Sequence, residues 1–168
     1  MNKKMQVLLA AIAGVGIVAL DQVTKWWAEN TLVNGSIPFW KDVFELHLVH
    51  NTGAAFGILK GNTPLLLALP SILVLALLYL YAKAPADSRM RPLRLVFLCL
   101  AAGGIGNLID RFRLGFVVDF LYFKLIDFPV FNVADIFATV SSFLLVFLLF
   151  FFYKEEDLTW LFPGEKRV

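Results

Sequence analysis

The sequence predicts a mainly α-helical, multi-pass membrane protein with four transmembrane helices and a small β-sheet on the outer face of the membrane. Of its 168 residues, 60% are hydrophobic and only 17% are charged, and the mean hydropathy is +0.76. An average soluble domain is about 45–50% apolar and about 25% charged. Four stretches of 15 to 20 residues contain no charged side chain, and parts of the chain between them alternate like strands. The length allows one domain, which we assign to residues 1–168.

The four uncharged stretches cover residues 5–20, 63–82, 95–109 and 136–153. A hydrocarbon core about 30 Å thick needs about 20 apolar helical residues, so each stretch is close to the required length. The first and third are short and must include flanking polar residues to complete the crossing. We therefore predict membrane helices over about 5–28, 63–83, 94–111 and 133–153, with outer segments over about 29–62 and 112–132.

The first stretch also has the outline of a secretory signal peptide, because Lys3 and Lys4 precede its apolar run. However, no good small-residue cleavage site follows it. Lys25, Trp26 and Trp27 follow instead, which is typical of a helix that ends in an aromatic belt at the membrane interface. We therefore expect this helix to be retained.

The distribution of lysine and arginine predicts the orientation in the membrane. If the N-terminus is cytoplasmic, the cytoplasmic segments 1–6, 82–94 and 153–168 carry nine basic residues in 35 positions. The outer segments 21–63 and 110–135 then carry six in 69 positions. Basic residues are enriched in cytoplasmic loops, so both termini are predicted to be cytoplasmic.

The first outer segment contains a strand-like alternation followed by a turn. Apolar and polar side chains alternate at Phe44, Glu45, Leu46, His47 and Leu48. This is the period of a half-buried strand, and Asn51-Thr52-Gly53 has the chemistry of a turn. Residues 119–131 are also aromatic-rich and strand-like. We expect the two segments to form the small sheet.

Polar residues in the fourth predicted helix share one face. Asn132, Asp135, Thr139 and Ser142 follow helical spacing in a segment that is otherwise almost wholly apolar. We expect Thr139 and Ser142 to form a polar seam that hydrogen-bonds neighbouring helices. Asp135 is a stronger candidate for function, because a carboxyl group at the membrane edge is costly.

Ionisable residues also end the first and third helices. Asp21 and Lys25 are four residues apart, in the order that favours a structural ion pair. Asn107 and Arg111 share a helix face, and Asp110 lies beside them. Asp110 and Arg111 are either part of a site or only a solvated boundary of the membrane.

Asp119 lies among apolar neighbours in the second outer segment, 16 residues before Asp135. A short excursion of the intervening chain could bring the two carboxyl groups together, although the sequence alone does not show that it does. For an enzyme at the outer membrane face, a carboxylate pair is the chemistry that remains after other classes are considered.

Those other classes have little support. The net charge is +2 and the basic residues are scattered, so we expect no nucleic-acid partner. His47 and His50 would face opposite sides of a strand, which disfavours a metal site. The single cysteine, Cys99, lies in an apolar run and is expected to be an inert buried thiol.

Five short motifs, in this order along the chain, closely resemble the bacterial lipoprotein signal peptidase family, signal peptidase II. The likeness covers about residues 5–152, and its specificity lies in the five motifs together. They are Asp21-Gln22-Val23-Thr24-Lys25, Asn51-Thr52-Gly53-Ala54-Ala55-Phe56, Gly106-Asn107-Leu108-Ile109-Asp110-Arg111, Val117-Val118-Asp119-Phe120 and Phe131-Asn132-Val133-Ala134-Asp135. One departure is Ile136, where many members carry a small hydroxyl residue; this puts only local packing in doubt.

The resemblance implies an aspartyl protease of the bacterial inner membrane, with four transmembrane helices and an extracytoplasmic β-cradle. It implies cleavage of prolipoproteins on the N-terminal side of a cysteine that carries diacylglycerol, at a site near the outer face. It also implies Asp119 and Asp135 as the catalytic dyad, with no metal or cofactor. The partners would be lipidated prolipoproteins and membrane lipid, and we expect a monomer. Residues implied to support the site or bind substrate are Asp21, Lys25, Asn51, Gly53, Asn107, Arg111 and Asn132.

Two other functions remain as alternatives. A small ion or proton transporter could use Asp21, Asp110, Asp119 and Asp135 as a relay, but these groups cluster toward one face of the membrane. A non-catalytic scaffold could bind a partner through the outer sheet, but it would leave both Asp119 and Asp135 unexplained.

Overall fold

The computed structural model describes residues 2–53 and 62–161, apart from the side chain of Lys3. In these residues four helices are long and apolar enough to cross a membrane. They are α1 (Lys3–Thr31), α2 (Thr63–Lys83), α3 (Arg91–Leu114) and α4 (Val133–Phe147), which η3 (Leu148–Phe152) continues. A three-stranded antiparallel sheet has the order β1 (Ile37–Trp40), β2 (Phe44–Asn51) and β3 (Val117–Tyr122). The predicted fold class is confirmed.

The helix ends follow from local sequence signals. The Asn62 side chain caps α2, and Pro64 occupies its first turn, where the missing N–H costs nothing. Helix α3 ends at Gly115, whose positive φ of 81° suits glycine. A capping box between Asn132 and Asp135 starts α4. Two residues that the sequence singled out as candidates for function therefore also determine where α4 begins.

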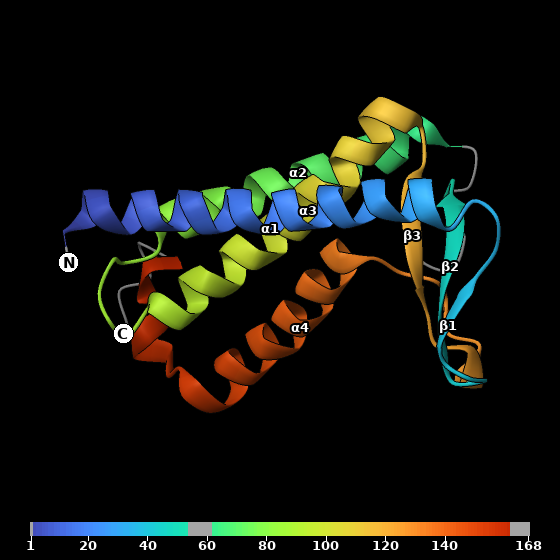
Figure 1. Cartoon of the computed structure of the whole chain (residues 1–168). Helices are drawn as coiled ribbons and strands as arrows, with labels where there is room; N and C mark the ends of the chain where they lie inside the picture. The colour runs from blue at the N-terminus through green and yellow to red at the C-terminus, as the bar shows by residue number, and fades with distance from the viewer. Residues whose placement is uncertain (1, 54–61, 162–168) are drawn as a thin grey trace.

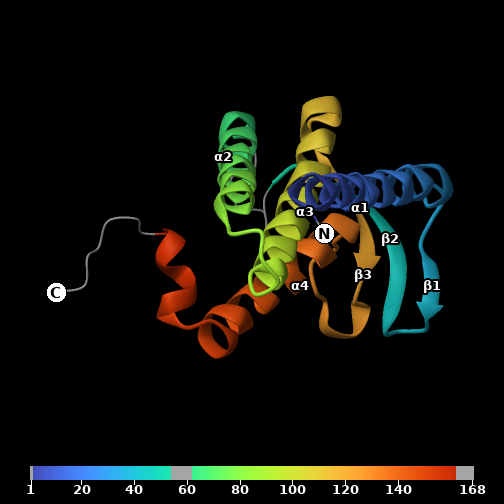
Figure 2. The same ribbon diagram turned by 90° about the vertical axis from the view of Figure 1, so that its left-hand side faces the viewer.

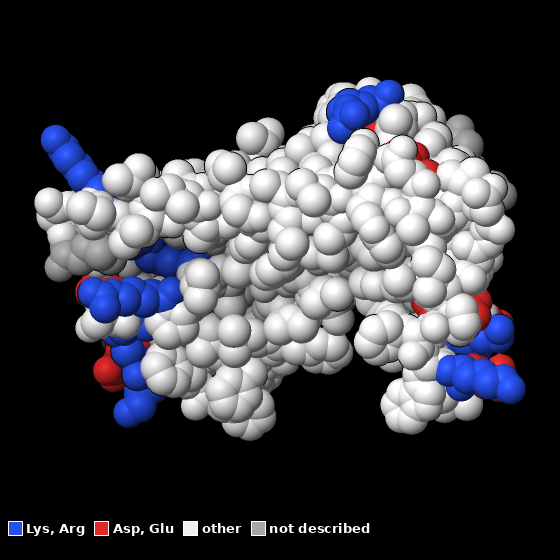
Figure 3. All heavy atoms as spheres, viewed as in Figure 1, with Lys and Arg blue, Asp and Glu red and all other residues white. Residues whose placement is uncertain are grey.

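The sheet stands at one end of the helices, and the start of α1 and η4 (Glu155–Leu161) lie at the other end (Figures 1 and 2). Between the two ends, the face shown in Figure 3 carries almost no charged side chains. Helix α3 is central. Half of the residues in its most apolar stretch of 18 are buried, whereas only 6% are buried in the corresponding stretch of α1. The exposed apolar surface of α1 is typical of a helix that faces lipid.

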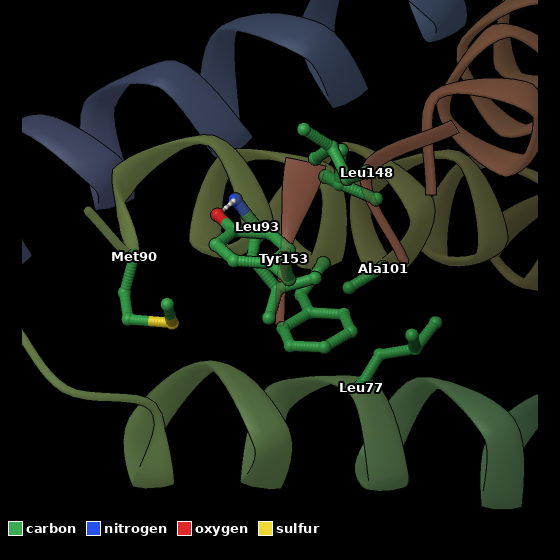
Figure 4. Close-up of a cluster of buried hydrophobic side chains, with 8 residues drawn as sticks. Leu77, Met90, Leu93, Ala101, Leu148 and Tyr153 are labelled. Carbon is green, nitrogen blue, oxygen red and sulfur yellow. Dashed lines mark hydrogen bonds between the residues drawn. The ribbon is translucent and has the colours of Figure 1, made fainter. Parts of the chain in front are cut away.

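The core at the end remote from the sheet joins α2, α3 and η3. Leu77, Leu93 and Leu148 are buried there against Tyr153 (Figure 4). The Tyr153 hydroxyl donates to the carbonyl oxygen of Arg89 at 3.0 Å and accepts from the backbone N–H of Leu93 at 3.3 Å. These bonds tie the chain that follows η3 to the first turn of α3.

The second outer segment differs from the prediction. Residues 119–131 were expected to be strand-like, but β3 ends at Tyr122 and a short 3-10 helix, η2 (Lys124–Ile126), follows. Asp127 then adopts a left-handed conformation with φ of 48°, which turns the chain. Phe131 pairs with Leu121 through backbone bonds of 2.8 and 3.0 Å. The excursion is therefore a closed loop that returns the chain to the start of α4.

Glycines in α3 allow three helices to approach closely. A Cβ atom on Gly103 would lie 2.7 Å from the carbonyl oxygen of Ala134 in α4, and one on Gly106 would lie 2.5 Å from the Asp21 carboxylate in α1. Small residues permit such contacts between membrane helices. These close contacts bring the part of α1 around Asp21, the second half of α3 and the start of α4 together beneath the sheet.

Candidate active site

Asp119 and Asp135 meet where the sheet joins the helices. Asp119 is on β3 and is 2% exposed, and Asp135 is in the first turn of α4. Asn132 contacts both carboxylates: its Nδ2 donates to Asp119 Oδ1 at 2.6 Å, and its backbone N–H donates to Asp135 Oδ2 at 3.2 Å. The structure therefore brings together the two carboxyl groups that are far apart in the sequence.

The Asn132 amide can take only one orientation. Its Oδ1 accepts the backbone N–H of Asp135 at 2.9 Å as part of the capping box. Since a backbone N–H only donates, the oxygen must face it, and Nδ2 must face Asp119. The second hydrogen of Nδ2 is donated to Asn107 Oδ1 at 3.0 Å.

Asn51 holds the other oxygen of Asp119. Its Oδ1 accepts the backbone N–H of Gly53 at 3.0 Å in the predicted turn, so its Nδ2 faces Asp119 Oδ2 at 2.9 Å. Arg111 Nη2 donates to the carbonyl oxygen of Gly53 at 3.0 Å, which fixes that turn to α3. Residues 54–56, the rest of this motif, lie outside the described part of the chain.

Lys25 lies beneath Asp135 and uses all three of its N–H donors. Its Nζ contacts Asp21 Oδ2 at 2.9 Å, Asp110 Oδ2 at 2.8 Å and Asn107 Oδ1 at 2.9 Å. The predicted ion pair with Asp21 is confirmed. Because an ammonium group cannot accept a hydrogen bond, it holds the Asn107 oxygen and directs Asn107 Nδ2 to Asp135 Oδ1 at 2.8 Å.

The remaining oxygens of this buried group are also satisfied. Asp21 Oδ1 accepts the backbone N–H of Ala134 at 2.9 Å, and Asp110 Oδ1 accepts from Gln22 Nε2 at 2.9 Å. Asp110 Oδ2, which contacts Lys25, also accepts the backbone N–H of Val118 at 3.1 Å. Asp110 is only 2% exposed, so its interpretation as a solvated boundary is wrong.

Sequence reasoning missed Gln22. Its Nε2 lies 2.9 Å from Asp110 Oδ1 and 3.2 Å from both Asp21 Oδ2 and the carbonyl oxygen of Gly106. It was visible as a polar residue inside the first motif, but nothing in its spacing indicated that it would bridge to α3.

The two carboxyl groups open into a pocket of about 660 Å³. Its polar lining is Asn51, Asn107, Arg111, Asp119 and Asp135. The rest is mainly apolar and comes from β3, from the loop after it and from α4: Val117, Phe123, Ile126, Phe128, Pro129, Val130, Phe131, Ile136, Ala138, Thr139 and Val140. Figure 3 shows the surface hollowed between α4 and the lobe that carries the sheet. The arrangement suits a ligand with one polar part and a large apolar part.

The predicted polar seam on α4 is wrong. Thr139 and Ser142 are exposed, and the Ser142 hydroxyl donates to the carbonyl oxygen of Ala138 in its own helix at 2.8 Å. The buried positions of α4 and η3 are Ala134, Ser141 and Leu148, seven residues apart. This spacing follows two helical turns, so positions 139 and 142 lie off the packed stripe.

Burial and the neighbouring Asp135 carboxyl together raise the pKa of Asp119 to about 6, although N–H donation from Asn51 and Asn132 opposes the rise. The described residues contain no cluster of three or more histidine, cysteine, aspartate or glutamate side chains that could hold a metal ion. With its raised pKa, the Asp119 carboxyl can hold a proton close to neutral pH at the head of the apolar pocket.

Known proteins resemble the chain over most of its length. A family model described as signal peptidase (SPase) II matches residues 13–151. The lipoprotein signal peptidase of Gloeothece citriformis is 42% identical over 153 residues, covering 89% of this chain and 92% of the relative. That of Clostridioides difficile is 41% identical over 144 residues, covering 83% and 94%.

Solved structures have the same fold. One, described as a bacterial membrane enzyme at 2.3 Å resolution, has a TM-score of 0.76 and 29% identity over 95% of this chain and 93% of its own. Another, at 1.9 Å resolution, has a TM-score of 0.75 and 32% identity over 86% and 94%. The chain belongs to the signal peptidase II family, the lipoprotein signal peptidases.

Proposed function

We propose that Asp119 and Asp135 are the catalytic dyad with which this signal peptidase II cleaves a prolipoprotein on the N-terminal side of its lipid-modified cysteine. One observation carries the proposal: the two carboxylates contact the same residue, Asn132, at the head of a pocket that is otherwise largely apolar. A peptide bond could reach the carboxyl groups while an attached lipid occupies the apolar part.

In this mechanism the two aspartates share one proton, because two close carboxylates cannot both ionise cheaply. One aspartate takes a proton from a water molecule, which attacks the carbonyl carbon of the scissile peptide. The other protonates the carbonyl oxygen, and a proton then reaches the leaving amine. The two carboxyl groups titrate as a unit, and neither a metal ion nor a cofactor takes part.

The surrounding residues hold the dyad rather than react. Asn51 and Asn132 each donate to Asp119, and Asn107 donates to Asp135. Lys25 with Asp21 fixes Asn107 from below. Arg111 and Gly53 keep the turn that carries Asn51 in place. Preorganised donors of this kind supply much of the rate enhancement in enzymes.

We further propose that the enzyme lies in the bacterial inner membrane as a monomer, with both termini cytoplasmic and the dyad near the outer face. The charge distribution along the sequence supports this orientation, as does the position of the sheet at the end of the helices opposite to the start of α1. Asp21, Asp110, Asp119 and Asp135 all belong to the connected group beneath the sheet, which disfavours a proton relay across the bilayer.

The test is cleavage of one precursor in two forms, with and without diacylglycerol on its cysteine, by the purified enzyme in lipid vesicles. We expect cleavage of the lipidated form only, measured by gel shift and by the mass of the released peptide. Each buried CH₂ group of the acyl chains contributes about 0.8 kcal/mol of membrane anchoring. This anchoring would hold the modified cysteine at the depth of the dyad. Equal rates for the two forms would contradict docking guided by lipid.

Cleavage should also depend on pH through the shared proton. The pKa of Asp119 is raised to about 6, so the proton is lost as pH rises through this value, and kcat/KM should fall on the alkaline side. Asn51→Ser keeps a short side chain that can accept from Gly53 but removes the N–H donor that lowers the pKa of Asp119. Its alkaline limb should therefore move to higher pH. A profile that is flat from pH 5 to 9, within roughly twofold, would be inconsistent with a shared proton.

A further inference from the structure

Thr139 lies one helical turn beyond Asp135 on the exposed side of α4. At about 1.5 Å per residue, the separation of four positions corresponds to about 6 Å along the helix axis, away from the sheet. Thr139 lines the pocket of the dyad and also a second pocket of about 330 Å³ farther along α4. It therefore stands where the two pockets meet.

The hydroxyl group of Thr139 makes no hydrogen bond with any residue that the structure describes, whereas the nearby Ser142 hydroxyl bonds its own helix at 2.8 Å. Both lie in the part of α4 that crosses the membrane. A hydroxyl group without a partner is costly in an apolar environment, and the hydrocarbon interior offers no water to satisfy it. A bound ligand that brings an acceptor to this position would remove that cost.

The position restricts the kind of acceptor. The peptide bond to be cleaved must lie at Asp119 and Asp135, so a group about 6 Å deeper belongs to another part of the substrate. The second pocket is mainly apolar, because Ala138, Phe143 and Val146 line it beside Thr139. Ser142 also lines it, but its hydroxyl already donates within its own helix. An acyl ester offers both features, because its carbonyl oxygen accepts a hydrogen bond and a long apolar chain continues from the same carbon.

We propose that the Thr139 hydroxyl donates a hydrogen bond to the ester carbonyl oxygen of the lipid on the substrate cysteine, with the acyl chain continuing along α4 over the second pocket. This inference rests on the proposed function. It makes Thr139 a specificity-determining residue, because the hydroxyl recognises the ester linkage itself and not merely apolar bulk.

The experiment uses the full-length enzyme in vesicles and two lipidated precursors that differ only in the glycerol linkage, one diester and one diether. Thr139→Val, which keeps the shape and removes the hydroxyl, should lower kcat/KM for the diester about fivefold to tenfold, the effect of one neutral hydrogen bond. The wild type should show the same loss when the diether replaces the diester. The variant should lose nothing further on the diether, because donor and acceptor form one interaction.

Two further variants control this result. Thr139→Ser should retain most of the diester rate, because it keeps a hydroxyl. Thr159→Val makes the same chemical change in η4, where the exposed hydroxyl donates to the carbonyl oxygen of Glu156 at 3.2 Å, and should leave both rates unchanged. Thermal unfolding should show that all variants fold.

Other outcomes would overturn the inference. Equal losses on diester and diether would assign Thr139 to packing or to the peptide, and no loss on either would remove it from recognition. A wild type that cleaves neither lipidated precursor would contradict the proposed function instead, so the two failures are distinguishable.

Discussion

Asp119→Asn and Asp135→Asn are each expected to lower cleavage of the lipidated precursor by at least about 10²–10⁴-fold, the contribution of general acid–base catalysis. Asparagine has nearly the same shape as aspartate, but it cannot share the proton. At position 119 its NH₂ group would also face the donor of either Asn51 or Asn132, since both amides have fixed orientations. The measurement is single-turnover cleavage in vesicles, which reports chemistry rather than product release.

The matched control for these variants is Asp42→Asn. Asp42 is exposed between β1 and β2 and has a left-handed backbone with φ of 58°, a conformation that asparagine also tolerates. This variant should cleave at the wild-type rate, and all three variants should insert into the membrane equally. Normal cleavage by Asp119→Asn or Asp135→Asn would contradict the dyad.

The helices could be predicted because crossing a bilayer imposes a length and excludes charge, and both constraints are visible along one chain. The packed face of α4 could not be predicted in this way. Helical spacing places Thr139 and Ser142 on the same side as Asp135, but it does not say which side meets α3. Gly103 and Ala134 decide that through close contact between two helices, and such a contact is a property of the fold.

In the candidate site, too, contacts within one helix could be predicted, whereas contacts between different elements could not. Spacing within one helix was enough to pair Asp21 with Lys25. The connection from Lys25 to Asn107 joins α1 to α3, and that from Asn132 to Asp119 crosses the loop between β3 and α4. No local pattern encodes these contacts, so the sequence indicated them only through resemblance to a family. Gln22 belongs to a matching motif, yet its role depends on facing α3, which the motif does not reveal.

Lys25→Met is expected to have the largest effect on stability of any single change in the buried group. Methionine fills similar space but leaves Asp21 and Asp110 without a counter-ion while both remain almost fully buried. Removing one partner of a buried ion pair costs about 3–5 kcal/mol. In a chain of this size 1 kcal/mol corresponds to about 2–4 °C, so the Tm should fall by about 6–20 °C. The exposed Lys41 serves as the control, and Lys41→Met should leave the Tm unchanged.

The double variant Lys25→Met with Asp110→Asn separates the two roles of the lysine. It restores the net charge of the buried group, so it should recover part of the lost Tm. Turnover should stay about 10-fold or more below wild type, the effect of losing one charge-assisted hydrogen bond, because Asn107 still lacks the ammonium that holds its oxygen. Full recovery of turnover together with Tm would show that Lys25 only balances charge. Recovery of Tm alone would show that the ammonium also acts through Asn107 on Asp135, the one carboxylate of the dyad to which Asn107 donates.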